Sequence, residues 1–212
     1  MKALLIVDVQ KGFIDGKLGS TWAQKVAPKI VKFARECRAK GFDIYATADT
    51  HSKREYEQTV EGQFLPLHCE DGTTEQKLAD GLLADENGNP IIKRGNIFNK
   101  GTFISYDLAH KMFWNYVDGS GHTELFDDTR SLGKDECHYG DSGEPLDEII
   151  IVGFVTSICV MGNALNLRSA FPATKITVIE NLCADLNEES HKAAIKVLEN
   201  NFINVGTIAN ED

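Results

Sequence analysis

Residues 148–153 read Glu148-Ile149-Ile150-Ile151-Val152-Gly153, and their four consecutive β-branched side chains make this the most strand-like run of the chain. A strand that is apolar on both faces needs cover on both faces, which is typical of a parallel sheet between helices. Similar apolar runs predict further strands at residues 2–8, 42–48 and 175–180. Helical periodicity predicts helices at residues 22–40, 157–169 and 188–200. This alternation predicts an α/β protein whose parallel sheet is covered by helices on each side.

The length of 212 residues suits one domain over residues 1–212, because two independent cores would be cramped. Apolar residues make up 42% and charged residues 25%, so the composition indicates neither a disordered nor a membrane protein. The formal net charge of -10 argues against nucleic acid or an anionic membrane as a partner, since both select a basic surface.

The apolar run after Met1 is too short for a secretory signal and ends at Asp8, so it reads as a buried strand. No segment approaches the roughly 20 apolar residues that a membrane-spanning helix needs. An odd, scattered set of cysteines in such a chain indicates reduced thiols and a cytoplasmic protein. The set comprises Cys37, Cys69, Cys137, Cys159 and Cys183.

Two polar stretches, residues 50–74 and 118–147, interrupt the alternation of strands and helices. Long irregular loops in a compact domain are often functional, and the second stretch reads as a loop insertion. Open parallel sheets bind their ligands beyond the carboxyl ends of the strands. The residues in that position are Asp8, Asp49, His51 and the segment that follows Gly153.

Cys159 is a candidate nucleophile, because it lies in the first turn of the predicted helix 157–169, just beyond a strand. Backbone N–H groups and the helix dipole at that place favour a thiolate and can hold a developing oxyanion. The alternative is a buried structural thiol, which is the commoner role of a lone cysteine. Two further residues are open to two readings each: Asp8 as a functional carboxylate or a turn cap, and Lys100 as a functional or a solvated charge.

Two carboxylates and two histidines form a candidate metal site. Asp49 and His51 directly follow a predicted strand, and Glu61 and His68 lie further along the same polar stretch. Nitrogen and oxygen ligands of this kind suit zinc, manganese or iron. The other histidines lack such company and read as ordinary surface or helix residues: His110, His122, His138 and His191.

Several motifs in a fixed order resemble one known family. They are Asp8-Val9-Gln10 with Phe13, Asp49-x-His51, Pro66-x-His68-Cys69 with Gly72-Thr73, Lys100, and Gly153-x-x-Thr156-x-x-Cys159-Val160. In this order the motifs resemble the isochorismatase-like cysteine hydrolase superfamily, and they match its nicotinamidase branch best. The resemblance spans the chain from Lys2 to about Asp185, and agreement of all the motifs is far more specific than any one of them.

The resemblance implies a doubly wound α/β fold and a catalytic triad of Asp8, Lys100 and Cys159. Asp8 would take the thiol proton and later give it to departing ammonia, while Lys100 holds the carboxylate and favours the thiolate. Cys159 would form a tetrahedral adduct and then an acyl thioester that water hydrolyses. The N–H groups of Val155 and Cys159 would form the oxyanion hole, after a cis peptide bond at Phe154–Val155.

The same resemblance implies one divalent ion that meets the pyridine nitrogen of the substrate, with zinc first and manganese or iron as alternatives. Asp49, His51 and His68 match its ligands directly. Glu61, seven residues before His68, matches the fourth ligand of some members, and Glu57 is held in reserve.

Other features of the chain bear on the substrate and the triad. Ser157 stands where many members have Asp, and the stretch 118–147 is longer than the resemblance leads one to expect. Lys93 competes with Lys100 for the place of the triad lysine, but Lys100-Gly101 followed by an aromatic residue fits the family better. Phe13 would pack on the substrate, or else serve as a core residue.

These features predict a nicotinamidase-like amidohydrolase that converts nicotinamide to nicotinate and ammonia. We expect a small-molecule amide as its partner, and a homo-oligomer. The enzymatic alternatives are another small amide or ureide hydrolase and an isochorismatase-type vinyl ether hydrolase, whose branches generally lack the metal set. The alternative from another class is a flavodoxin-like nucleotide-binding module, although Gln10-Lys11-Gly12-Phe13 is no glycine-rich phosphate loop.

Overall fold

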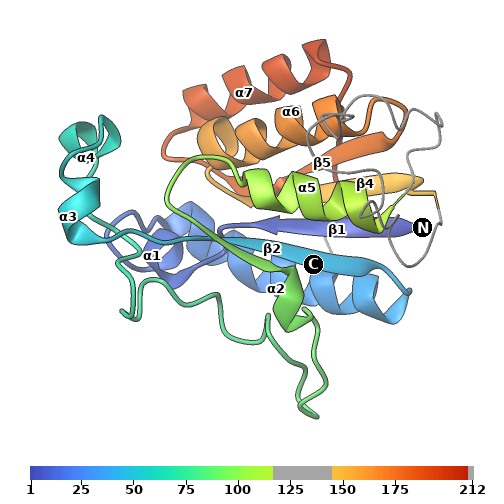
Figure 1. Cartoon of the computed structure of the whole chain (residues 1–212), viewed down its shortest axis with the longest axis horizontal. Helices are drawn as coiled ribbons and strands as arrows, with labels where there is room; N and C mark the ends of the chain where they lie inside the picture. Colours follow the sequence, from blue (N-terminus) through green and yellow to red (C-terminus); the bar gives the residue numbers. More distant parts are fainter. Residues whose placement is uncertain (117–144, 210–212) are drawn as a thin grey trace, which may run out of the picture.

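The computed structural model describes residues 1–116 and 145–209, and within them six parallel strands form one sheet in the order β3-β2-β1-β4-β5-β6 (Figure 1). The strands are β1 (Lys2–Val7), β2 (Asp43–Asp49), β3 (Ile97–Lys100), β4 (Glu148–Phe154), β5 (Lys175–Ala184) and β6 (Asn204–Gly206). The strand order reverses between β1 and β4, which is the switch point where open parallel sheets bind ligands.

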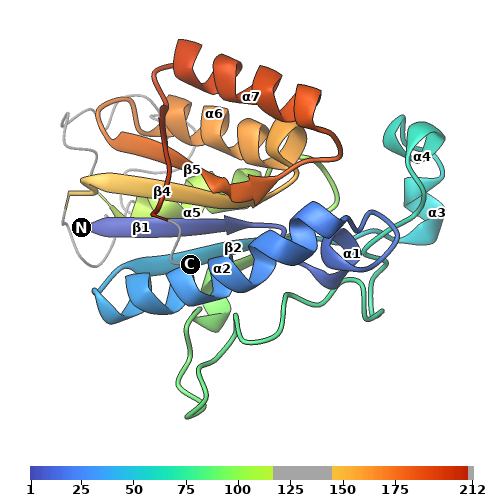
Figure 2. The ribbon, with the colours of Figure 1, turned by 180° about the vertical axis from the view of Figure 1, so that it is seen from behind.

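Helices cover both faces of this sheet. Figures 1 and 2 show α2 (Thr21–Ala39) on one side, and α5 (Tyr106–Asn115), α6 (Met161–Ala170) and α7 (Glu188–Asn200) on the other. Alternate residues of β1 divide between the two cores, since Leu4 packs with α2 and Leu5 with α5 and α6. The predicted α/β class, with a doubly wound parallel sheet and helices on both faces, is confirmed.

Local sequence explains the long helix α2. The side chain of Ser20 accepts a hydrogen bond from the backbone N–H of Ala23 and so caps the helix start. The buried side chains recur at helical spacing. Gly41 follows the helix end with a φ of 83°, a value that glycine adopts without steric cost. The helix predicted at residues 22–40 is therefore present, shifted by one residue at each end.

Gly153 allows the ends of β1 and β4 to meet. It pairs with Val7, and its φ is 128°. A Cβ at this position would lie 2.7 Å from the backbone nitrogen of Val7 and closer still to its carbonyl oxygen, so another side chain would displace the neighbouring strand. The close approach brings Asp8 alongside the turn that follows β4.

The structure adds elements that the sequence pattern did not predict. These are β3, β6, α5, a 3-10 turn at Arg94–Asn96 and the short helices α1 (Lys11–Ile14), α3 (Lys53–Tyr56) and α4 (Glu61–Phe64). The helix predicted at 157–169 begins instead with a π-helical turn, Thr156–Val160, before α6. The strand predicted at 175–180 continues to Ala184.

Some predictions fall outside the described part of the chain. The predicted insertion at 118–147 lies there except for its last three residues, as do Cys137, His122 and His138. The other cysteines are buried free thiols. Among the helices of residues 1–116 and 145–209, none is long and apolar enough to cross a membrane.

Candidate active site

Four side chains meet where the strands end. Asp8 follows β1, Asp49 ends β2, Lys100 ends β3, and Cys159 lies in the π-helical turn after β4. Pairing of Asp49 with Lys100 places the ends of β2 and β3 side by side. All four residues are buried, with exposed fractions of 0% to 7%. The structure therefore gathers the residues of the predicted triad, together with one predicted metal ligand, inside the protein.

Lys100 is the centre of this group. Its Nζ lies 2.7 Å from Oδ2 of Asp8, 3.3 Å from Oδ1 of Asp49 and 3.6 Å from Sγ of Cys159. One buried ammonium thus contacts two carboxylates and the thiol. Lys93, the competing lysine, is 60% exposed and pairs with Asp43 at 3.6 Å, near the start of β2.

The chain turns sharply at Asp8, which has a φ of 49°, a value uncommon for residues other than glycine although aspartate tolerates it. Thr47 of β2 holds the carboxylate, because its hydroxyl donates a 2.7 Å hydrogen bond to Oδ1 of Asp8. The other oxygen of Asp8 faces Lys100. The aspartate is therefore fixed on both sides, by a neutral donor and by a cation.

Burial and charge set the protonation of the three groups. Burial raises the pKa of Asp8, and the nearby Lys100 ammonium opposes that shift. Burial disfavours the charged form of Lys100, but Asp8, Cys159 and Asp49 outweigh it and raise the pKa of Lys100. The pKa of the Cys159 thiol lies well above its ordinary value because burial raises it more than Lys100 lowers it. Burial therefore favours the neutral form of the thiol, and the Lys100 ammonium opposes that preference.

A second cluster adjoins the first through Asp49. Oδ2 of Asp49 lies 2.9 Å from Nε2 of His51 and 3.0 Å from Nε2 of His68, and Glu61 approaches His68 at 3.7 Å. One ligand atom from each of these four residues lies within 4.8 Å of the others. We call Asp49, His51, Glu61 and His68 the histidine cluster. Glu57 is exposed at the end of α3 and does not belong to this cluster.

The hydrogen bonds of His68 indicate that this cluster fits a cation. The Pro66 carbonyl lies 2.9 Å from Nδ1 of His68 and can only accept, so Nδ1 carries a proton. In a neutral His68 the lone pair of Nε2 then faces Oδ2 of Asp49, so two acceptors point at each other. A divalent ion with nitrogen and oxygen ligands matches such an arrangement. Burial raises the pKa of Asp49, but the neighbouring His51 and His68 and the charge of Lys100 outweigh it and lower that pKa well below its ordinary range.

Both clusters line one narrow cavity. Asp49, Glu61 and His68 lie on its wall together with Cys159. The remaining wall is apolar and consists of Phe13, Leu18, Leu65, Phe103, Val155, Ile158 and Leu186. Phe13 was predicted either to pack on the substrate or to serve as a core residue. Its ring is only 4% exposed, belongs to a buried apolar cluster and packs edge-on against His68 at 5.3 Å between ring centroids. One cavity therefore adjoins both the thiol and the histidine cluster.

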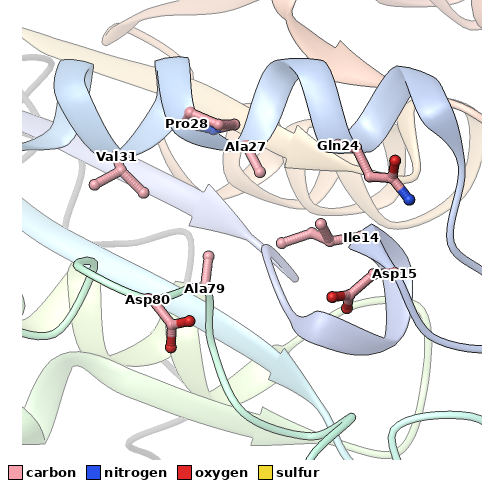
Figure 3. Close-up of a pocket in the computed structure, with 8 residues that line it drawn as sticks. All are labelled: Ile14, Asp15, Gln24, Ala27, Pro28, Val31, Ala79 and Asp80. Atoms are coloured by element: carbon pink, nitrogen blue, oxygen red, sulfur yellow. The ribbon is translucent and has the colours of Figure 1, made fainter.

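A second, larger cavity of about 430 Å³ lies between α1, α2 and residues 79–80 (Figure 3). Ile14, Ala27 and Val31 give it an apolar floor, and Asp80 at its rim pairs with Lys11 at 3.0 Å. None of its lining residues belongs to either cluster. The reactive groups therefore favour the smaller cavity as the site of chemistry.

The turn after β4 is tied to the end of β5. The peptide bond between Phe154 and Val155 is cis, as the resemblance implied. The hydroxyl of Thr156 donates to the carbonyl of Ala184 at 3.0 Å, so it must accept from Nδ1 of His191 at 2.9 Å. His191 was expected to be an ordinary surface or helix residue. It lies in helix α7, where it is buried and contacts this turn.

Sequence reasoning also missed a role for Gln10. Its side-chain oxygen accepts from the backbone N–H of Asp49 at 2.7 Å, and its nitrogen donates to the Asp49 carbonyl at 2.8 Å. The same nitrogen donates to the carbonyl of Gln76 at 2.7 Å. The amide of Gln10 therefore replaces a peptide unit beside Asp49 after β1 has turned away. Its place two residues after Asp8 was the available signal.

Comparison with known proteins points to one family. The model of the isochorismatase domain matches residues 2–105 and 142–210. No curated protein matches the chain in sequence. Among solved structures, the nicotinamidase of Bacillus subtilis superposes with a TM-score of 0.69 at 20% identity, over 97% of this chain and 98% of that one.

Two other solved structures widen the comparison. The pyrazinamidase of Pyrococcus horikoshii, solved in complex with zinc, gives a TM-score of 0.66 at 19% identity, over 98% of this chain and 99% of that one. The N-carbamoylsarcosine amidase of Thermoplasma acidophilum gives 0.65 at 17% identity, over 100% of this chain and 98% of that one. At these identities the likeness establishes the fold, which proteins with different substrates share.

Proposed function

This chain belongs to the isochorismatase family, and on that premise we propose that it is a cysteine amidohydrolase that converts nicotinamide to nicotinate and ammonia. The observation that carries the proposal is the position of Lys100 between Asp8, Asp49 and Cys159, beside a histidine cluster in the same cavity. A buried thiol next to a base and a fixed cation suits acyl transfer through a covalent intermediate.

Asp8 would serve as the base. It takes the proton of the Cys159 thiol as the sulfur attacks the amide carbon, and it gives that proton to the nitrogen as the carbon–nitrogen bond breaks. Ammonia leaves and a thioester remains on Cys159. Asp8 then takes a proton from water as the water oxygen attacks the thioester, and it returns that proton to the sulfur. Lys100 stays charged throughout and offsets the negative charge that moves between Asp8 and Cys159.

Backbone groups would stabilise the tetrahedral intermediates. We assign the oxyanion hole to the N–H groups of Val155 and Cys159, in and beside the π-helical turn. The backbone N–H of Val160 bonds to the carbonyl of Val155 at 3.1 Å, which closes this wider turn around the thiol. Such turns occur often at functional sites.

Asp49, His51, Glu61 and His68 would hold one divalent ion, with zinc as the first choice and manganese or iron as alternatives. When bound, the ion would supply a Lewis acid for the pyridine nitrogen of the substrate. Phe13, which lies on the apolar wall and packs against His68, would pack on the pyridine ring. Substrate alignment would then depend on the histidine cluster, and bond cleavage on Cys159.

Ammonia release from purified protein tests the proposal. The substrates are nicotinamide, pyrazinamide, a ureide and N-carbamoylsarcosine, with metal content measured on the same sample. We expect nicotinamide to be the best substrate and about one divalent ion per chain. A preference for a ureide, or full activity after exhaustive chelation, would contradict the proposal and favour a metal-independent member of the family. The Cys159→Ala variant controls for contaminating amidases.

A further inference from the structure

Asp185 follows the last residue of β5, at the same edge of the sheet as the site. It is 4% exposed, and its carboxylate accepts three hydrogen bonds from the protein. Oδ2 accepts from the backbone N–H of Ser157 at 2.6 Å. Oδ1 accepts from the Ser157 hydroxyl at 3.1 Å and from the backbone N–H of Leu186 at 2.7 Å. Two of these donors belong to the turn that carries the proposed oxyanion hole.

The charge of Asp185 makes these bonds strong. Among the ion pairs of residues 1–116 and 145–209, none includes Asp185. A buried carboxylate without a cation is stable only when hydrogen bonds satisfy it. Bonds from N–H groups to an ionised acceptor are shorter and stronger than bonds between neutral groups. The carboxylate therefore holds Ser157 firmly.

The preceding residue is fixed to the same strand end. Thr156 donates to the carbonyl of Ala184, next to Asp185, and accepts from His191. Two consecutive residues of the turn are thus anchored to β5 and α7, and they lie between the two proposed oxyanion donors, Val155 and Cys159. Misplacement of a donor by about 1 Å can cost about a hundredfold in rate.

We propose that Asp185 is a positioning residue for amide hydrolysis, which holds the Val155 and Cys159 N–H groups in register with the developing oxyanion through its bonds to Ser157. This inference rests on the proposed function. It assigns Asp185 no contact with the reacting atoms. Its effect must therefore fall on the transition state, whereas a purely structural role would lower stability and leave kcat in the folded enzyme unchanged.

Asp185→Asn tests the inference in the metal-loaded full chain. In one orientation the NH2 group of the asparagine faces the backbone N–H of Ser157, and in the other it faces that of Leu186. Two donors then face each other, so one strong hydrogen bond is lost in either case. We expect kcat for the best amide to fall at least about tenfold, while KM changes less than about threefold. Binding of pyridine-3-carbaldehyde, whose adduct with Cys159 places an oxygen in the oxyanion hole, should weaken by the same factor as kcat.

Two variants serve as matched controls. Asp43→Asn alters another hydrogen-bonded carboxylate, which accepts from the Tyr116 hydroxyl at 2.7 Å near the start of β2. It should leave kcat within about twofold, since its site is remote. Ser157→Ala removes the hydroxyl and keeps the backbone bond to Asp185, so its loss of kcat should stay below about threefold.

Hydrogen exchange of the peptide that covers residues 155–160 supplies a test without turnover. Uptake should rise in Asp185→Asn and stay unchanged in Asp43→Asn. An unaltered kcat in Asp185→Asn, or equal exchange in both variants, overturns the inference. If no amide is hydrolysed and the aldehyde does not bind to Cys159, the proposed function is wrong, independently of the role of Asp185. The exchange result then still decides whether Asp185 anchors the turn.

Discussion

At the amino ends of the strands, Glu148 pairs with Lys2 at 2.9 Å and with Lys175 at 2.7 Å, and both lysines are more than half exposed. At the carboxyl ends, Lys100 pairs with Asp8 and Asp49 at similar distances, and all three are almost fully buried. Water can replace a lost partner at the first edge but not at the second. Similar ion pairs should therefore matter little for stability at one edge and greatly at the other.

The largest expected effect is on the nucleophile. Cys159→Ala should lower turnover at least about 10⁴-fold, because loss of a covalent nucleophile removes the whole reaction path. Cys183→Ala is the matched control, since Cys183 is equally buried on β5 and lies outside the cavity. Steady-state ammonia release measures both. Comparable activity in the two variants would place the chemistry elsewhere.

Lys100→Met should break the buried network. It leaves Asp8 and Asp49 without their cation, which should cost about 3–5 kcal/mol in the free energy of unfolding and at least about a hundredfold in rate. Denaturant titration and kinetics measure the two effects. Lys2→Met at the exposed edge should change neither by a comparable amount.

The double variant Asp8→Asn/Lys100→Met sharpens this result. If the two residues act as one unit, the combined rate loss should be much smaller than the product of the single losses. Fully multiplicative losses would show that the two residues act independently.

The histidine cluster should bind the metal through Glu61 and not through Glu57. His68→Ala and Glu61→Gln should each lower metal affinity at least about tenfold and lower activity in parallel. Glu57→Gln, with an exposed side chain nearby, should change neither. Metal analysis after dialysis, paired with ammonia release, gives both quantities. Normal metal content in Glu61→Gln would remove it from the ligand set.

The smallest effect is expected at the exposed edge. Hydrogen bonds from Lys175 and Lys2 outweigh burial and lower the pKa of Glu148, so its contribution to stability is present above the pKa of an unfolded glutamate. It should be lost as the pH falls through the lowered folded pKa. Glu148→Gln should cost less than about 1 kcal/mol near pH 7, and the difference from wild type should shrink as the pH falls through that lowered pKa. A difference that grows on acidification would contradict this sign.

The sequence predicted what local pattern determines. β1, β2, β4, α2 and α7 follow from apolar runs and helical spacing. β3 and β6 have only four and three residues, too few for a pattern, and they exist because neighbouring strands pair with them. The approach of Lys100 to Asp8 is a property of the sheet, which places β3 two strands away from β1.

Asp185 shows why part of the site escaped prediction. The rule that selected Asp8 and Asp49 looks just beyond each strand end, and the predicted strand 175–180 ended too early. Glu180 and Asn181 interrupt the apolar run, yet β5 continues past a register shift to pair Cys183 with Gly153. With the true end at Ala184, the same rule selects Asp185. Backbone pairing, which the side chains do not reveal, made the difference.

The two oxygens of Asp49 face different clusters, one toward Lys100 and the other toward His51 and His68. Under the proposed function, both clusters depend on Asp49, so a change in one cluster constrains the other during evolution. A lineage that abandoned the ion could discard both histidines, but it would have to keep an acceptor beside Lys100. A lineage that replaced Lys100 would disturb the ion as well. Divergence toward new substrates would then fall on the apolar wall, which includes Leu18, Leu65 and Phe103.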